Sequence, residues 1–179
     1  MTSMPSRSSG VILLEVLVTI VILVVGLLGL AGFQVRSTLA ENESYQRAQA
    51  LVLAQDMVDR IYANRVNAAT YVQDDIGAAG TVTVCAGTGE ARDVCEWSNE
   101  LVGAGETASG VSVGTLTGGR GCITAGAANE YFVVVVWKGL SPTVAPGAAC
   151  GLNAYGAPNE AFRRAVSMRI VISTLSTAT

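Results

Sequence analysis

Apolar residues form one long, nearly uncharged run close to the start of the chain. Residues 11–32 contain no proline and one charged side chain, that of Glu15. About 20 apolar residues are enough for a helix to cross a membrane. A carboxylate that deep in the run costs about 2.5–3.5 kcal/mol on insertion, so it needs a partner that supplies positive charge. The pattern predicts a transmembrane helix that meets a cation inside the membrane.

The helical pattern does not stop at the end of the apolar run. Residues 33–65 are rich in good helix formers and contain no proline. Their apolar positions recur with helical spacing, at Leu51, Ala54, Met57, Val58, Ile61 and Tyr62. We therefore expect one helix over residues 11–65, apolar on all sides in its first half and amphipathic in its second half, where it packs on a domain.

The remaining residues, 66–179, read as a small α+β domain. Residues 131–137 (YFVVVVW) form the strongest predicted strand, and residues 164–174 predict a final strand. A third β-like piece lies at 81–84, and a short helix is expected around 93–102. The predicted architecture is a long N-terminal helix packed on a small antiparallel sheet.

Composition narrows the chemistry that this domain can perform. The chain has 179 residues, a net charge of −3 and no histidine. It therefore lacks the commonest acid–base group and metal ligand. The acidic balance gives no general attraction to nucleic acid, and Arg163-Arg164 is the only basic pair. We expect no enzyme, no cofactor, no metal site and no direct nucleic-acid binding.

Four cysteines, Cys85, Cys95, Cys122 and Cys150, indicate the compartment. An even number in an exported domain favours disulfides, and the alternative is four reduced, buried thiols in a cytosolic protein. Three pairings are possible. We favour Cys85–Cys95, which closes a tight loop, and Cys122–Cys150, which ties the start of the central strand to the loop before the last strand.

Three interpretations of the N-terminus compete. A secretory signal has a shorter apolar core, with its cleavage site after that core, whereas Gly10 here precedes the run. A plain membrane anchor explains the length but leaves Glu15 without a role. The stretch from Gly10 through Val11 to Glu15 resembles the start of type IV prepilins, which accounts for the glycine, the length and the acid together.

The resemblance to type IV prepilins carries specific implications for single residues. It implies that residues 1–10 are a leader, which a prepilin peptidase removes by cutting between Gly10 and Val11. The enzyme would then N-methylate Val11, where the class usually has phenylalanine. Glu15 would pair with the terminal amine of a neighbouring subunit during assembly.

Within this class the chain resembles the minor pilins of the PilV group, the type IV pilus modification proteins. The stretches that carry this likeness are residues 11–18, 26–34 and, above all, 56–65 (DMVDRIYANR), with weaker support from Cys95 with Trp97, Trp137, Cys150-Gly151 and Arg163-Arg164. The resemblance implies a subunit of a type IV pilus or of its initiation complex, which supports assembly and, indirectly, motility or adhesion.

The same resemblance implies partners and a location. Partners would be other minor and major pilins, the prepilin peptidase and the inner-membrane assembly platform. The chain would span the inner membrane once, with residues 66–179 in the periplasm, and would then enter the pilus. Two alternatives stay open at this point: a minor pseudopilin of a type II secretion system, and a membrane-anchored adhesin or DNA receptor.

Overall fold

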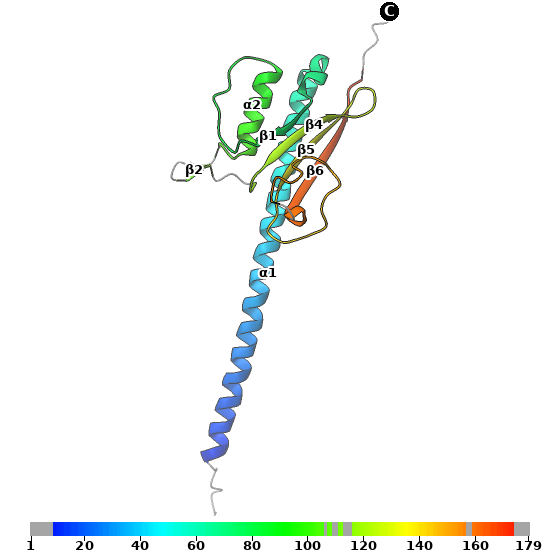
Figure 1. Ribbon diagram of the computed structural model, residues 1–179. Helices are drawn as coiled ribbons and strands as arrows, with labels where there is room; N and C mark the ends of the chain where they lie inside the picture. The colour runs from blue at the N-terminus through cyan, green and yellow to red at the C-terminus, as the bar shows by residue number, and fades with distance from the viewer. Residues whose placement is uncertain (1–8, 106, 109–110, 113–115, 157–158, 174–179) are drawn as a thin grey trace, which may run out of the picture. The chain divides into compact units, whose positions relative to one another are not determined.

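Helix α1 (Ser9–Ala63) is the longest element of the computed structural model, which describes residues 9–105, 107–108, 111–112, 116–156 and 159–173. By its internal contacts the chain divides into two units, Met1–Asn42 and Glu43–Thr179. The boundary falls within α1 (Figure 1). We call the described residues of the first unit the stem and those of the second unit the head. The helix ends two residues before the predicted position.

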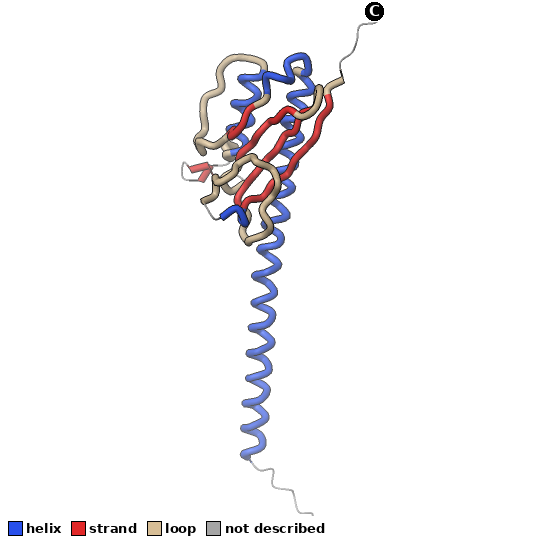
Figure 2. The backbone as a smooth tube through the Cα atoms, turned by 45° about the vertical axis from the view of Figure 1, so that its right-hand side comes forward, coloured by secondary structure: helices blue, strands red, loops and turns tan. Residues whose placement is uncertain are grey.

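Four antiparallel strands form the main sheet of the head. They are β1 (Gln73–Ile76), β4 (Arg120–Ala125), β5 (Glu130–Lys138) and β6 (Arg163–Val171), in the spatial order β1-β4-β5-β6. Short elements complete the head: η1 (Arg65–Tyr71), α2 (Glu90–Leu101), β2 (Thr107–Ala108), β3 (Val111–Ser112) and η2 (Asn159–Phe162). The predicted helix-on-antiparallel-sheet fold with disulfides is confirmed (Figure 2).

The inner face of the sheet packs on two helices and forms the main core. Helix α1 contributes Ala50, Ala54, Met57 and Ile61, none of which is exposed, and α2 contributes Val94, Trp97 and Leu101. The sheet contributes alternate residues, as a half-buried strand pattern requires: Ile123, Val133, Val135, Val166 and Ile170. The amphipathic second half of the predicted helix therefore packs as expected.

One glycine lets α2 approach the sheet closely. A Cβ atom at Gly121 would lie 2.2 Å from the Trp97 ring. The ring is fully buried, and its Nε1–H donates to the carbonyl oxygen of Leu53 at 2.8 Å. Trp97 thus joins α1, α2 and β4 at one point.

The predicted strand at residues 81–84 is wrong. That segment is irregular, and it lies against α2 rather than in a sheet. The Asn99 side chain accepts from the Thr83 N–H at 2.9 Å and donates to the Thr83 carbonyl at 2.7 Å. One side-chain amide therefore supplies the two bonds that a neighbouring strand would have supplied.

The other predicted elements match closely. The expected strand at 131–137 is β5. The final strand, expected at 164–174, is β6, and Thr174 lies outside the described residues. The helix expected around 93–102 is α2, which begins earlier, at Glu90. Four strands had no prediction: β1, β2, β3 and β4.

Candidate functional site

The stem presents a continuous apolar surface. Every side chain from Val11 to Val35 is exposed in the isolated chain, and Glu15 carries the only charge among them. By length and composition, α1 is the one helix of the described residues that could cross a membrane. The Thr19 hydroxyl donates to the carbonyl oxygen of Val16 at 2.8 Å, so this polar group is satisfied inside the helix. A surface of this kind requires lipid or other apolar helices around it.

Three stem glycines have no structural role within the chain itself. A Cβ atom at Gly26, Gly29 or Gly32 would meet nothing within 4 Å. Glycine weakens a helix by about 1 kcal/mol relative to alanine. Two roles remain for these glycines: they make the stem flexible, or they allow another helix to pack closely against it.

The residues that the resemblance singles out lie near the start of α1. Gly10, Val11 and Glu15 are all helical. All three belong to the first unit, Met1–Asn42. The expected leader, residues 1–10, falls outside the described part except for Ser9 and Gly10.

At the start of the head segment of α1, Glu43 fixes the loop that follows β5. One carboxylate oxygen accepts from the N–H groups of Leu140 and Ser141, both at 3.0 Å, and from the Ser141 hydroxyl at 2.9 Å. Arg164 on β6 approaches the same oxygen at 3.3 Å. Burial tends to raise the pKa of Glu43, but the hydrogen bonds from Ser141 and Arg164 outweigh it and hold the pKa below its usual value. Glu43 thus joins α1, the loop and β6.

Arg163 holds the same loop from its other side. Its side chain is nearly fully buried and donates to the carbonyl oxygens of Cys150 at 3.0 Å and Pro146 at 3.1 Å, and also to that of Ala148. Its Nε–H donates to Glu160, which lowers the pKa of that carboxyl group. The basic pair Arg163-Arg164 is therefore engaged in internal contacts, with loop carbonyl groups, Glu160 and Glu43.

A network of charges joins α1 to α2. Arg60 contacts Asp56 at 2.7 Å, Glu96 at 2.9 Å and Glu100 at 3.0 Å. Burial opposes ionisation of the guanidinium, yet the hydrogen bonds that it donates to Glu96 and Asp56 raise its pKa. The pKa of Glu100 is raised, first by burial and then by the nearby Asp56 carboxylate. These ion pairs hold α2 against α1.

Two disulfides fasten the irregular parts of the head. The structure joins Cys85 to Cys95, ten residues apart, and Cys122 to Cys150, 28 residues apart, the pairs that the sequence favours. The first ties the segment before α2 to α2. The second anchors the loop between β5 and β6 on the outer face of β4, where Val134 and Val136 complete a second apolar cluster.

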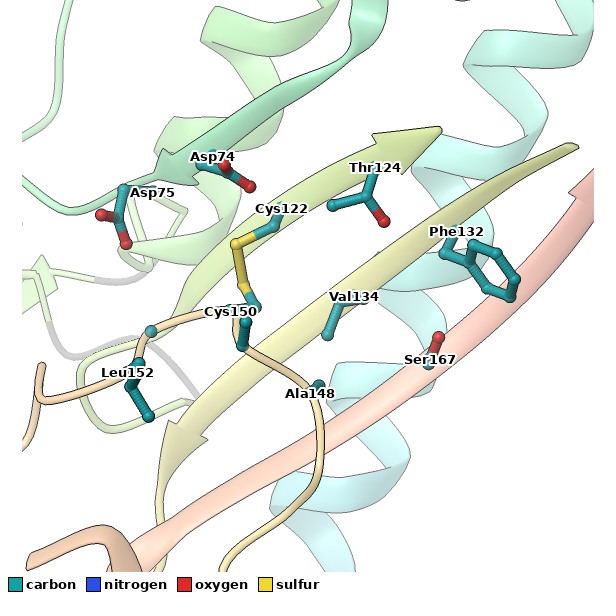
Figure 3. Close-up of a pocket in the computed structure, with 12 residues that line it drawn as sticks. Asp74, Asp75, Cys122, Thr124, Phe132, Val134, Ala148, Cys150, Leu152 and Ser167 are labelled. Atoms are coloured by element: carbon teal, nitrogen blue, oxygen red, sulfur yellow. A yellow bond between two sulfur atoms is a disulfide. The ribbon is translucent and has the colours of Figure 1, made fainter. Parts of the chain in front are cut away.

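The outer face of the sheet holds a groove of about 510 Å³. Its floor includes the Cys122–Cys150 disulfide, Thr124 and Val134, and β1 places Asp74 and Asp75 along one side (Figure 3). Its hydroxyl groups have no histidine to activate them, since the chain contains none. Among the described residues no group of three or more possible metal ligands comes together.

Comparison with known proteins gives one match. A family model described as Tt1218-like, type IV pilin Tt1218, matches residues 32–98, which run from the stem through α2. No curated protein and no solved structure matches the chain. The match supports a type IV pilin, a structural rather than an enzymatic class, and does not reach Gly10, Val11 or Glu15.

The sequence did not reveal Glu43, Arg163 or Arg164 as structural anchors of the loop. Arg163-Arg164 stood out only as a basic pair, and their roles depend on loop carbonyl groups up to 23 residues away. A buried arginine that serves main-chain oxygens leaves no partner pattern in the sequence, because any residue supplies a carbonyl group.

Proposed function

We propose that the chain is a minor pilin of a type IV pilus, of the kind represented by the PilV group. A prepilin peptidase cleaves it between Gly10 and Val11 and N-methylates Val11. The chain then resides in the inner membrane through residues 11–32, with residues 66–179 in the periplasm. It passes through the assembly platform into the pilus or its initiation complex, beside other minor and major pilins.

One combination of observations carries this proposal. An exposed apolar stem with a single acid adjoins a region, residues 32–98, that matches a type IV pilin model. An apolar helix surface of this length is stable in lipid as a monomer and in a bundle of similar helices as a filament. Glu15 then serves as the group that sets the position of each subunit, because a carboxylate in an apolar environment requires a counter-charge.

The proposal is tested at Glu15. Glu15→Ala should leave cleavage by the peptidase intact and reduce recovery of the chain in sheared pili by at least about tenfold, which corresponds to about 1.4 kcal/mol. Thr19→Ala is the matched control, since it removes a polar group from the same stem without removing a charge. Equal recovery of the Glu15→Ala variant and the wild type in sheared pili, with normal co-purification of other minor pilins, contradicts the proposal.

Processing is tested separately at Gly10. Gly10→Val should leave a full-length precursor in the membrane, about 1 kDa heavier than the mature chain for ten short residues. Mass measurement of the purified chain gives the result directly. A mature protein that begins at a residue other than Val11 would contradict the assigned cleavage position.

A minor pseudopilin of a type II secretion system is the second candidate, because the features of the stem suit either filament. Deletion of the chain discriminates between the two. Loss of surface pili with normal secretion of exported enzymes supports the pilus, and the opposite result supports the secretion system. Normal pili and normal secretion with loss of surface attachment or DNA uptake would instead favour an adhesin or DNA receptor.

A further inference from the structure

The sheet of the head has two edges, and the β6 edge is open. β6 pairs with β5 over all nine of its residues, from Lys138↔Arg163 to Glu130↔Val171. Just beyond the two ends, Gly139 N–H donates to the Phe162 carbonyl at 2.7 Å and Ile172 N–H donates to the Asn129 carbonyl at 2.8 Å.

These two bonds identify the backbone groups that face outward. In an antiparallel pair, hydrogen-bonded residues alternate with non-bonded ones, so the even-numbered residues of β6 bond to β5. The odd-numbered residues therefore turn their N–H and C=O groups away from β5; after Arg163 these are Ala165, Ser167, Arg169 and Val171. Within the described part of the chain no hydrogen bond engages these groups.

The opposite edge, β1, is built differently. It has four residues, its register with β4 shifts between Gln73 and Ile76, and Asp75 has a φ of 55°. It also carries two exposed carboxylates, Asp74 and Asp75. Short length, a register shift and charge are means by which proteins limit uncontrolled pairing at an edge, and the two carboxylates favour a cationic partner strand.

The charges of the two edges are complementary. Arg169 on β6 and Lys138 at the end of β5 are cationic, since Arg164 is already paired with Glu43, whereas β1 carries Asp74 and Asp75, the second of which lies 3.7 Å from Arg120. Arg169 is paired with Glu130, yet its side chain is 64% exposed. Contact between two β6 edges, or between two β1 edges, would bring like charges together. Contact between a β6 edge and a β1 edge brings opposite charges together.

The directions of the strands, and the face of the sheet on which the charged side chains lie, both allow contact between β6 and β1 of a second copy. Because four strands alternate in direction, a second sheet placed beside the first in the same orientation presents its β1 antiparallel to β6. Asp74 and Ser167 both line the groove on the outer face, and Arg169 follows Ser167 by two residues. The carboxylate and the guanidinium group therefore lie on the same face of the extended sheet.

We propose that β6 of one copy accepts β1 of a second copy, so that the two heads form one continuous antiparallel sheet. Such a contact joins different surfaces on the two copies and extends into a row rather than closing on itself. The contact goes beyond the proposed function, because it joins two copies of this chain to each other rather than to other pilins. Its occupant is a second copy of this chain, selected by the carboxylates of β1.

The experiment uses the full chain in its membrane, carrying photoreactive benzoylphenylalanine in place of exposed Gln73 on β1. Irradiation should give a dimer, and peptide mapping should locate the adduct within residues 163–171 of the second copy. Ser167→Pro should lower the dimer yield about tenfold, because proline removes an N–H that faces the neighbour and none that bonds to β5. Ser167→Ala is the control and should leave the yield unchanged.

A second variant guards against misfolding of Ser167→Pro. Ser167→Glu keeps the backbone groups but places a carboxylate beside Asp74 and Asp75, so it should also lower the dimer yield several-fold. Formation of both disulfides in each variant reports an intact head. An adduct that maps outside residues 163–171, or a yield that neither Ser167→Pro nor Ser167→Glu lowers, overturns the pairing.

Crosslinking in membranes and recovery in sheared pili, measured on the same culture, separate this inference from the proposed function. If the wild-type chain gives the β1–β6 adduct in membranes but is absent from sheared pili, the pilus assignment fails and the edge contact stands. If the chain is present in sheared pili without the adduct, the edge contact fails and the pilus assignment stands.

Discussion

The two parts of helix α1 differ in what covers them. From Val11 to Val35 every side chain is exposed, whereas in the head Ala50, Ala54, Met57 and Ile61 are fully buried. Both parts are helical, so local propensity alone does not distinguish them. The difference teaches that the head is stabilised by its own sheet, while the stem depends on surroundings that the chain does not supply. Substitutions in the two parts should therefore have separate consequences.

The largest effect on the head is expected at Trp97. Trp97→Ala removes a fully buried ring that joins α1, α2 and β4, and should lower the free energy of unfolding of the head by about 3–5 kcal/mol. Chemical denaturation followed by circular dichroism gives the value. A loss of less than 1 kcal/mol would show that the ring is not the centre of this core.

Removal of a disulfide should have the next largest effect, and the loss of unfolding free energy should be greater for the longer loop. Replacing Cys122 and Cys150 by alanine should cost about 3–4 kcal/mol, since their separation is 28 residues. Replacing Cys85 and Cys95, ten residues apart, should cost about 3 kcal/mol or less. The same denaturation measurement compares the two double variants. A larger loss for the shorter loop would contradict the chain-entropy explanation.

Substitution of Glu43 tests at which residue α1 begins to contribute to the stability of the head. Glu43→Gln should lower the free energy of unfolding by about 1–2 kcal/mol, because it weakens the bonds to Ser141 and Arg164. Glu41→Gln, one helical step before the boundary at Asn42, is the matched control and should have no effect on the head.

The pH dependence of that pair sharpens the same test. The folded pKa of Glu43 is lowered, so its contribution is present above the unfolded value of about 4.3 and is lost as pH falls through the folded pKa. Between neutral pH and about pH 3 the wild type should therefore lose more stability than the Glu43→Gln variant. Parallel curves for the two proteins would exclude this role.

The smallest effect is expected in the stem. Leu23→Ala should leave unfolding of the head unchanged within about 0.5 kcal/mol, because Leu23 is 64% exposed and belongs to the first unit. Leu23→Ala should affect only retention in the membrane or packing between subunits. A loss of several kcal/mol in the head would show that the two parts of α1 are coupled in folding.

Strong sequence patterns made the two helices and the strands β5 and β6 predictable. The proline-free run behind α1 and the apolar, β-branched run behind β5 each carry their own signal. β4 was missed because its sequence, RGCITA, is short and starts beside a glycine-rich turn. β1 was missed because Gln73, Asp74 and Asp75 have weak strand propensity and pair through tertiary context.

The candidate site also has one part that the sequence predicts and one part that it does not. Glu15 was found because a charge inside an apolar run is visible without a structure. The open edge of β6 could not be found, because the sequence does not state which strand ends the sheet. The strand predicted at 81–84 failed for a related reason, since the amide of Asn99 replaces a strand partner that local pattern cannot reveal.

Arg163 has a consequence for how the surface of this protein can change over time. It holds the loop between β5 and β6 through main-chain oxygens, which every amino acid provides. The outward side chains of that loop, such as Val144 at 93% exposure, have no part in this support. The outward side chains of the loop can therefore be substituted during evolution while the hydrogen bonds from Arg163 to the loop backbone stay the same.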